Sequence, residues 1–107
     1  MTRLRISTEY RKGVFFIRLT GRMEDNADYL KNMHDLIMDF GIKKIVLNLN
    51  NLEYVSLENI AHIIKYNNEI LKKEQHLLIC DSNQQRNQMF RNIIPNISNE
   101  LEAFSLI

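Results

Sequence analysis

The chain contains 107 residues with a formal net charge of +1, and this length predicts one domain spanning residues 1–107. The near-zero charge argues against a nucleic-acid-binding protein that works through a large basic field, and no apolar run reaches the roughly 20 residues that span a bilayer. The single cysteine, Cys80, excludes a disulfide framework and a cysteine-based zinc site. Since the N-terminus also lacks the pattern of a signal peptide, we expect a cytoplasmic protein that binds no nucleic acid and does not insert into a membrane.

The N-terminal residues predict a two-stranded hairpin. In residues 4–9, Leu4, Ile6 and Thr8 alternate with Arg5, Ser7 and Glu9, which is typical of an edge strand with one buried face. Residues 11–13 form a turn signal with a glycine at its end, and residues 14–20 predict a second strand that Gly21 ends. Because the connecting turn is short, the two strands should pair antiparallel.

A helix and a buried strand follow the hairpin. The helix should begin at Asp25 or Asn26, since both residue types cap helix N-termini well, and end at Gly41. Residues 43–49 are apolar enough for a central strand, and residues 52–55 predict a short connection after it. The expected buried face of the helix comprises Leu30, Met33, Ile37 and Phe40.

The second half of the chain predicts two more helices. Ser56 is the expected N-cap of a long helix that runs to about Lys72. Residues 76–80 predict a fourth strand, and residues 81–83 cap a third helix. The expected buried stripe of the long helix comprises Leu57, Ile60, Ala61, Ile64 and Leu71, with Ile63 and Ile70 beside it. The third helix should carry Met89, Phe90, Ile93 and Ile94.

The order of the elements, β-β-α-β-α-β-α-β, predicts an α/β domain with a mixed sheet. Residues 101–106 supply the last short strand. The third and fourth strands are joined through a helix, so they should be parallel, with a right-handed crossover. We therefore expect Ile45–Leu49 and Leu77–Cys80 to be adjacent buried strands of one sheet, with helices packed mainly on one face.

Four segments of the chain carry a known pattern in the same order and spacing. Val14–Met23 reads as a strand with the motif I-x-L-x-G, Ile45–Leu52 as a strand and exit of the form I-V-L-N-L-x-x-L, Tyr54–Ile60 as a loop motif, and Leu77–Cys80 as a further strand. In these segments the sequence resembles the STAS domain, the fold of bacterial anti-sigma-factor antagonists. The resemblance covers nearly the whole chain and implies a single STAS-like domain.

The resemblance also implies where a partner binds. In STAS-domain antagonists the loop motif opens the second helix, and an anti-sigma kinase phosphorylates a serine or threonine there. The unphosphorylated form binds the anti-sigma factor. With Leu52 as the anchor, the phosphoacceptor position falls on Leu57, which has no hydroxyl, and the glycine position falls on Asn59. The resemblance thus implies a partner-binding surface at Ser56, Leu57, Glu58 and Asn59 that lacks the usual phosphoacceptor.

Three of these residues are open to a second interpretation. Ser56 is either the N-cap, accepting from the backbone N–H of Glu58 or Asn59, or a phosphoacceptor displaced by one residue. Glu58 either imitates a phosphate or favours the helix dipole as an ordinary first-turn acid. Leu57 is either an exposed apolar anchor for a partner or a core residue, and the pattern favours neither.

No catalytic, metal or cofactor site is predicted. Three histidines lack ligand-like spacing: His34, His62 and His76. Cys80 lies in an apolar strand and is expected to be a small buried hydrophobe, and the start of a helix explains the paired carboxylates Asp25 and Asp28. No Ser/His/Asp or Cys/His set and no glycine-rich phosphate loop can be assembled. We therefore expect a protein without a cofactor that is not an enzyme.

Three functional hypotheses remain. The first is a non-catalytic regulatory module that binds an anti-sigma factor or a related kinase-like protein without classical serine phosphorylation. The second is a STAS subunit of an ABC-type lipid transport complex, packed against the ABC ATPase, and this role requires no phosphoserine. The third is a scaffold or sensor domain in another signalling assembly.

Overall fold

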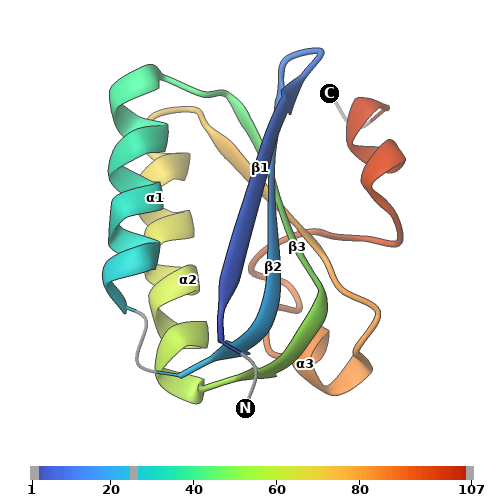
Figure 1. The fold of residues 1–107 in the computed structure, drawn as a ribbon. Coiled ribbons are helices and arrows are strands. Elements are labelled where there is room, and N and C mark those ends of the chain that lie inside the picture. The colour runs from blue at the N-terminus through green and yellow to red at the C-terminus, as the bar shows by residue number, and fades with distance from the viewer. Residues whose placement is uncertain (1–2, 25–26, 106–107) are drawn as a thin grey trace.

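The computed structural model describes residues 3–24 and 27–105. The elements are β1 (Arg5–Arg11), β2 (Val14–Met23), α1 (Ala27–Phe40), β3 (Lys44–Val55), α2 (Leu57–Leu71), β4 (His76–Cys80), α3 (Gln84–Gln88), β5 (Asn96–Ile97) and the 3-10 helix η1 (Glu100–Phe104). The strands form one sheet in the order β1-β2-β3-β4-β5 (Figure 1). β1 pairs antiparallel with β2, and the other neighbours are parallel. The predicted α/β mixed sheet, with β3 and β4 adjacent, is confirmed.

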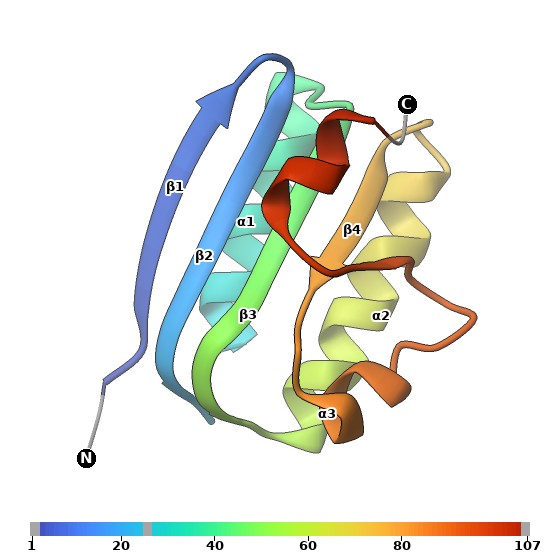
Figure 2. The ribbon, with the colours of Figure 1, turned by 90° about the vertical axis from the view of Figure 1, so that its right-hand side faces the viewer.

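The strand order explains the layers of the molecule. Connections between parallel strands of one sheet are right-handed crossovers. Because each crossover here adds the next strand on the same side, successive helices emerge on the same face of the sheet. α1 and α2 cover that face, whereas η1 crosses the opposite face (Figure 2). The prediction that helices pack mainly on one face is confirmed.

The sheet separates two apolar layers. Side chains alternate along β2, so that Phe15 and Ile17 join the layer under α1 and α2, while Phe16 joins the layer under η1. The Phe104 ring of η1 meets the Phe16 ring edge-on, with 5.7 Å between the ring centroids. The η1 layer comprises Val14, Phe16, Val46, Leu78, Cys80, Ile97 and Ala103, with Phe104 against it.

The predicted N-caps of α2 and α3 and the predicted end of α1 are confirmed. Gly41 follows α1 with a φ of +60°, which suits a glycine after a helix. The side-chain oxygens of Ser56 and Asn83 accept from backbone N–H groups of α2 and α3 as N-caps. The predicted start of α1 at Asp25 or Asn26 lies outside the described residues.

Two strands are longer than predicted. β2 continues past Gly21 to Met23. A Cβ on Gly21 would lie 2.3 Å from the carbonyl oxygen of Arg3, so this glycine permits a close approach of the chain and does not end the strand. β3 includes residues 52–55, which we had predicted as a connection. The register of β3 with β2 shifts twice, and after these shifts Leu52, Tyr54 and Val55 are still paired with β2.

The predicted buried faces of the two long helices are partly wrong. Phe40, the last residue of α1, is 74% exposed. On α2, Leu57, Ala61 and Leu71 are exposed and do not belong to the buried stripe. The residues of α2 that are buried are Asn59, Ile60, Ile63, Asn67 and Ile70. Asn59 and Asn67 thus belong to the buried face of α2, for which only apolar residues were predicted.

The C-terminal third contains the largest departures from prediction. The strand expected over residues 101–106 is wrong: Glu100–Phe104 forms η1, because Asn99 caps a turn that starts with acidic residues. Leu106 lies outside the described residues. The third helix ends at Gln88, and Asn92, with a φ of +66°, is incompatible with a helix that reaches residue 94. The residues expected on it, Met89, Phe90, Ile93 and Ile94, follow it in turns, where Phe90 and Ile94 still enter the core.

Candidate functional site

The four candidate residues lie at the first turn of α2, where β2 and β3 end (Figure 1). Ser56 precedes the helix in an extended conformation, and its hydroxyl oxygen accepts from the backbone N–H of Asn59 at 3.2 Å. The Ser56 backbone N–H donates to the carbonyl of Met23 at 3.0 Å. The first contact is the capping role expected for Ser56, and the second fixes the turn to the end of β2.

Asn59 lies beneath the turn and is only 1% exposed. Its side-chain amide donates to the Met23 carbonyl at 3.2 Å, to the Ser56 hydroxyl at 2.9 Å and to the Glu24 carbonyl. Where the resemblance implies a glycine, this chain therefore places an amide that joins α2 to the end of β2. The side chain supports the turn from inside.

Leu57 and Glu58 form the outer side of the same turn. Leu57 is 70% exposed, which decides the question that the sequence left open. The Glu58 carboxylate is mostly exposed and lies 3.7 Å from Nε2 of His62, one turn along the helix. Next to them in the chain, Tyr54 is partly exposed, and the guanidinium of Arg22 lies over its ring at 4.7 Å. We refer to Arg22, Tyr54, Leu57 and Glu58 as the α2-start surface.

Sequence analysis missed Arg22 and Tyr54. The two residues become neighbours because β2 and β3 remain paired to their last residues, with Arg22 opposite Tyr54. Since residues 52–55 were predicted as a connection, nothing in the pattern indicated this pairing.

The histidines and the cysteine take structural positions. The His34 and His62 rings both stack on the Tyr66 ring, and their centroids lie 4.7 Å and 6.3 Å, respectively, from the Tyr66 centroid. His76 is the first residue of β4. Cys80 is 1% exposed, and burial raises the pKa of its thiol, which disfavours a thiolate nucleophile. Among residues 3–24 and 27–105, no group of three or more His, Cys, Asp and Glu side chains is placed to hold a metal ion.

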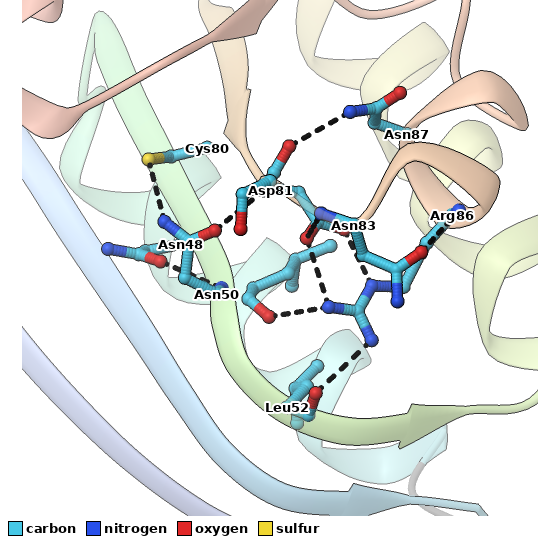
Figure 3. A network of polar contacts seen from close by, with 10 residues as sticks. Asn48, Asn50, Leu52, Cys80, Asp81, Asn83, Arg86 and Asn87 are labelled. Carbon is cyan, nitrogen blue, oxygen red and sulfur yellow. Dashed lines mark hydrogen bonds and ion pairs between the residues drawn. The ribbon is translucent and has the colours of Figure 1, made fainter.

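A buried ion pair connects α3 to β3 (Figure 3). Arg86 is 8% exposed, and its Nε and Nη2 donate to the Asp81 carboxylate at 2.6 and 3.0 Å. The same guanidinium donates to the carbonyls of Leu49 at 2.8 Å and Leu52 at 3.3 Å. These carbonyls belong to the part of β3 where its register with β2 is irregular. Four of the five guanidinium N–H groups donate to these acceptors, and the Asp81 carboxylate pairs with the charge, so this network holds the fold together and offers no anion site.

Asparagine side chains extend this network from the middle of β3 to the carboxyl end of β4 (Figure 3). The Asn50 side chain accepts from the backbone N–H of Ser82 at 2.6 Å and donates to Sγ of Cys80 at 3.5 Å. The backbone N–H of Asn50 donates in turn to the side chain of Asn48 at 3.0 Å. These side chains order β3 around Asn48 and Asn50 and join it to the segment that leads from β4 into α3.

Comparison with solved structures identifies the architecture. The anti-sigma factor antagonist SpoIIAA in its unphosphorylated form matches with a TM-score of 0.78 at 12% identity, over 96% of this chain and 96% of that one. The chain has the STAS fold. An anti-sigma factor antagonist from Mycobacterium paratuberculosis matches with a TM-score of 0.81 at 14% identity, over 96% of this chain and 92% of its own. The protein TM1081 matches with a TM-score of 0.78 at 16% identity, over 92% of this chain and 85% of its own.

The chain shares the STAS fold with these structures, although the sequence identities are only 12%, 14% and 16%. No protein-family model matches the chain, and no curated protein matches it. In the part of the chain that the structure describes, no helix is long and apolar enough to cross a membrane. Within the STAS fold the candidate residues stand at the start of α2, with Leu57 and Glu58 outside, Ser56 as the cap and Asn59 beneath.

Proposed function

We propose that the chain is a non-catalytic regulatory protein of the cytoplasm that binds an anti-sigma factor or a related kinase-like protein through the α2-start surface. The observation that carries this proposal is the 70% exposure of Leu57 in a fold shared with anti-sigma factor antagonists. An apolar side chain on a fixed turn can be buried by a partner with little loss of conformational freedom. Ser56 and Asn59 supply that fixation.

The chemistry of the surface favours a partner with an apolar pocket bordered by a basic group. Leu57 would fill the pocket, and the exposed Glu58 carboxylate would pair with the basic group. Arg22 and Tyr54 extend the surface with a cation and an aromatic ring. Charge at the rim of such an interface mainly affects the association rate and the choice of partner.

We further propose that this binding is not released by phosphorylation. Leu57 has no hydroxyl, so no phosphate can be attached at the position that the resemblance assigns to the phosphoacceptor. The only neighbouring hydroxyl in the turn is that of Ser56, which accepts from Asn59 and donates to the Glu24 carbonyl at 3.3 Å. A phosphate on Ser56 would have to break this cap. The chain would therefore be competent to bind at all times.

A second partner fits the same surface. A STAS subunit that packs against an ABC ATPase requires no phosphorylated residue, and the absence of a hydroxyl at Leu57 favours such a role as well. The two functions differ in the identity of the bound protein and not in the position of the interface, so one capture experiment distinguishes them.

The test is capture of partners from the native cell with the tagged chain, followed by mass spectrometry and affinity measurement. We expect Leu57→Ser to weaken the complex by about thirtyfold, the effect of losing an interface hot spot of about 2 kcal/mol. Glu58→Arg should weaken it through charge reversal. Leu71→Ser is the matched control, because Leu71 is a partly exposed leucine at the other end of α2.

The identity of the captured protein and the two variants decide between the outcomes. A kinase-like regulator supports the first function and an ABC ATPase the second. If Leu57→Ser and Glu58→Arg fold and bind like the wild type, the interface lies elsewhere and the proposed surface is wrong.

A further inference from the structure

The two edges of the sheet differ in how much backbone they offer to another strand. β5, at one edge, has only two residues. β1, at the other edge, has seven residues without a proline and pairs with β2 without a register shift from Arg5 to Arg11 (Figure 2). A long and regular edge strand presents a row of backbone donors and acceptors with which a second strand can pair. The sheet can therefore be extended at β1.

The geometry of the hairpin determines which groups of β1 face outward. The turn residues Lys12 and Gly13 have φ values of +51° and +83°, as in a type I′ turn, so Arg11 and Val14 form the hydrogen-bonded pair that closes the hairpin. Hydrogen-bonded and non-hydrogen-bonded pairs alternate along an antiparallel ladder. The odd-numbered residues of β1 thus direct their backbone groups toward β2. The even-numbered residues direct theirs to the open edge.

The side chains of β1 divide between the two faces of the sheet. Glu9 lies on the η1 face, where its Oε1 is 2.8 Å from Nη2 of Arg18. Ile6 packs on the layer under the helices, and Tyr10, on the same face, is 64% exposed. Tyr10 borders a groove of about 350 Å³ that is also lined by Phe15, Leu36, Phe40, Gly41 and Ile42. An exposed aromatic ring at an open edge indicates a surface that a further chain can cover.

Charge selects one arrangement in which β1 pairs with β1 of a second copy. A two-fold axis at Ser7, Thr8 or Glu9 matches the outward backbone groups and keeps at least five residues of each β1 paired. An axis at Thr8 places Arg5 opposite Arg11 twice, and an axis at Glu9 places the two Glu9 carboxylates opposite each other. An axis at Ser7 places Arg5 opposite Glu9 twice. Opposite charges across a ladder stabilise it, and like charges destabilise it.

We propose that β1 is a homodimerisation strand, which pairs antiparallel with β1 of a second copy about a two-fold axis at Ser7. Each Glu9 carboxylate then lies between Arg18 of its own chain and Arg5 of the other. Tyr10 lies opposite Leu4 of the other chain, so its ring becomes covered. The α2-start surface is not part of β1, so this inference is independent of the proposed function.

Arg11 stands opposite Arg3 at the two ends of the proposed interface. These two residues lie at or beyond the ends of the paired segment, where long side chains can diverge into water. The Arg11 guanidinium is already directed onto the Phe104 ring of its own chain, 5.7 Å from the ring centroid. The arrangement about Thr8 also carries its like charges at the ends, so the two Arg5–Glu9 pairs, which only the axis at Ser7 supplies, decide between the two arrangements.

The first test uses charge reversal and sedimentation of the full chain. We expect Arg5→Glu and Glu9→Arg each to weaken dimerisation roughly tenfold or more, because each places like charges opposite one another twice. An equal mixture of the two variants should dimerise again, since each interface pair then joins opposite charges. Lys31→Glu, which changes an exposed lysine on α1 by the same charge, is the control and should dimerise like the wild type. Circular dichroism checks that all variants are folded.

The second test determines the register by disulfide cross-linking. In the proposed dimer Ser7 faces Ser7 of the other chain as a non-hydrogen-bonded pair, with Cα atoms about 4.5 Å apart, within the range of a disulfide. Ser7→Cys should therefore give a covalent dimer on mild oxidation. Thr8→Cys is the control, because Thr8 faces Ile6 of the other chain. The native Cys80 is 1% exposed and does not compete.

Each outcome of the two tests either supports or overturns the proposed dimer. Dimerisation of the wild type, its recovery in the mixture of variants and cross-linking through residue 7 together support the proposal. A wild-type chain that stays monomeric at the highest concentration at which it remains in solution overturns it. Cross-linking through residue 8 in place of residue 7 overturns the register, and unchanged dimerisation of both charge variants assigns the interface to another surface.

Discussion

Asn59 shows how one buried side-chain amide can hold the first turn of a helix in place. The side chain fills the space beneath the first turn of α2 and donates to the carbonyls of Met23 and Glu24 and to the Ser56 hydroxyl. A glycine at this position would leave these acceptors to other donors. The turn that presents Leu57 is consequently held by the side-chain hydrogen bonds of Asn59 together with the cap of Ser56.

Replacement of Asn59 by alanine should destabilise the fold by about 1–3 kcal/mol, because buried carbonyls then lose their donor. Urea unfolding measures this change. Asn68→Ala is the matched control, since Asn68 lies on the same helix but is exposed, and it should stay within about 0.5 kcal/mol of the wild type. Equal stability of the two variants would contradict the role assigned to Asn59.

At the scale of elements, α3 depends on its attachment to β3. A helix of five residues is too short to be stable alone. Arg86 supplies the attachment, through the Asp81 carboxylate and the carbonyls of Leu49 and Leu52. The hydrogen bonds of Arg86 therefore fix the position of α3, and they also hold the irregular part of β3 at Leu49 and Leu52 in place.

Arg86→Ala should destabilise the fold strongly, by about 3–5 kcal/mol, because it leaves the buried Asp81 carboxylate without its partner. Thermal or urea unfolding provides the measurement. Arg91→Ala, which removes an exposed arginine just after α3, should change the stability by no more than about 0.5 kcal/mol. A mild effect of Arg86→Ala would mean that water replaces the guanidinium and that α3 is held by packing alone.

η1 is attached to the sheet by charge as well as by packing. Nε and Nη2 of Arg18 donate to the two carboxylate oxygens of Glu100, each at 2.8 Å, and Asn48 donates to the same carboxylate at 2.8 Å. Lys44 donates to the Ala103 carbonyl at 2.8 Å. The Arg18 hydrogen bonds, followed by the one from Asn48, hold the pKa of the Glu100 carboxyl below its usual range.

This pKa shift predicts a loss of stability in acid. A carboxyl whose pKa is lowered by folding stabilises the fold fully above its ordinary pKa of about 4.3, and this contribution disappears as the pH falls through the lower pKa of the folded state. Glu100→Gln should therefore be less stable than the wild type near neutral pH, and the difference should shrink below about pH 4.3. A difference that is constant with pH, measured by urea unfolding, would contradict the proposed ion pair.

At the scale of the whole molecule, the fold could be predicted further than the site. The apolar runs of β3 and β4 and the cap Ser56 indicated a crossover between them, and this predicted correctly that the two strands are parallel neighbours. The second half of β3 escaped prediction because it is held by contacts with Ser82 and Arg86, which are distant in sequence. The local sequence pattern could not decide whether the Leu57 side chain is exposed to water. The residues around it depend on where β2 and β3 end.

The proposed regulation gives a prediction for the molecule as it exists in the cell. A chain without a phosphoacceptor at residue 57 should bind its partner equally well before and after phosphatase treatment. Intact mass and partner affinity of the natively expressed protein measure both quantities. Stoichiometric phosphate on Ser56 that abolishes binding would show that the switch has moved by one residue and that the proposal of permanent competence is wrong.

The two faces of the sheet are covered at different times during synthesis. α1 and α2 precede β4 in the chain, so the helices of one face are made before the fourth strand is complete. The opposite face, with Val14, Phe16 and Val46, is covered only by η1, which is made after all five strands. A ribosome-bound chain that has released β4 but not residues 100–104 thus displays an apolar sheet surface to water and to chaperones. Translation speed over this last segment sets how long that exposure lasts.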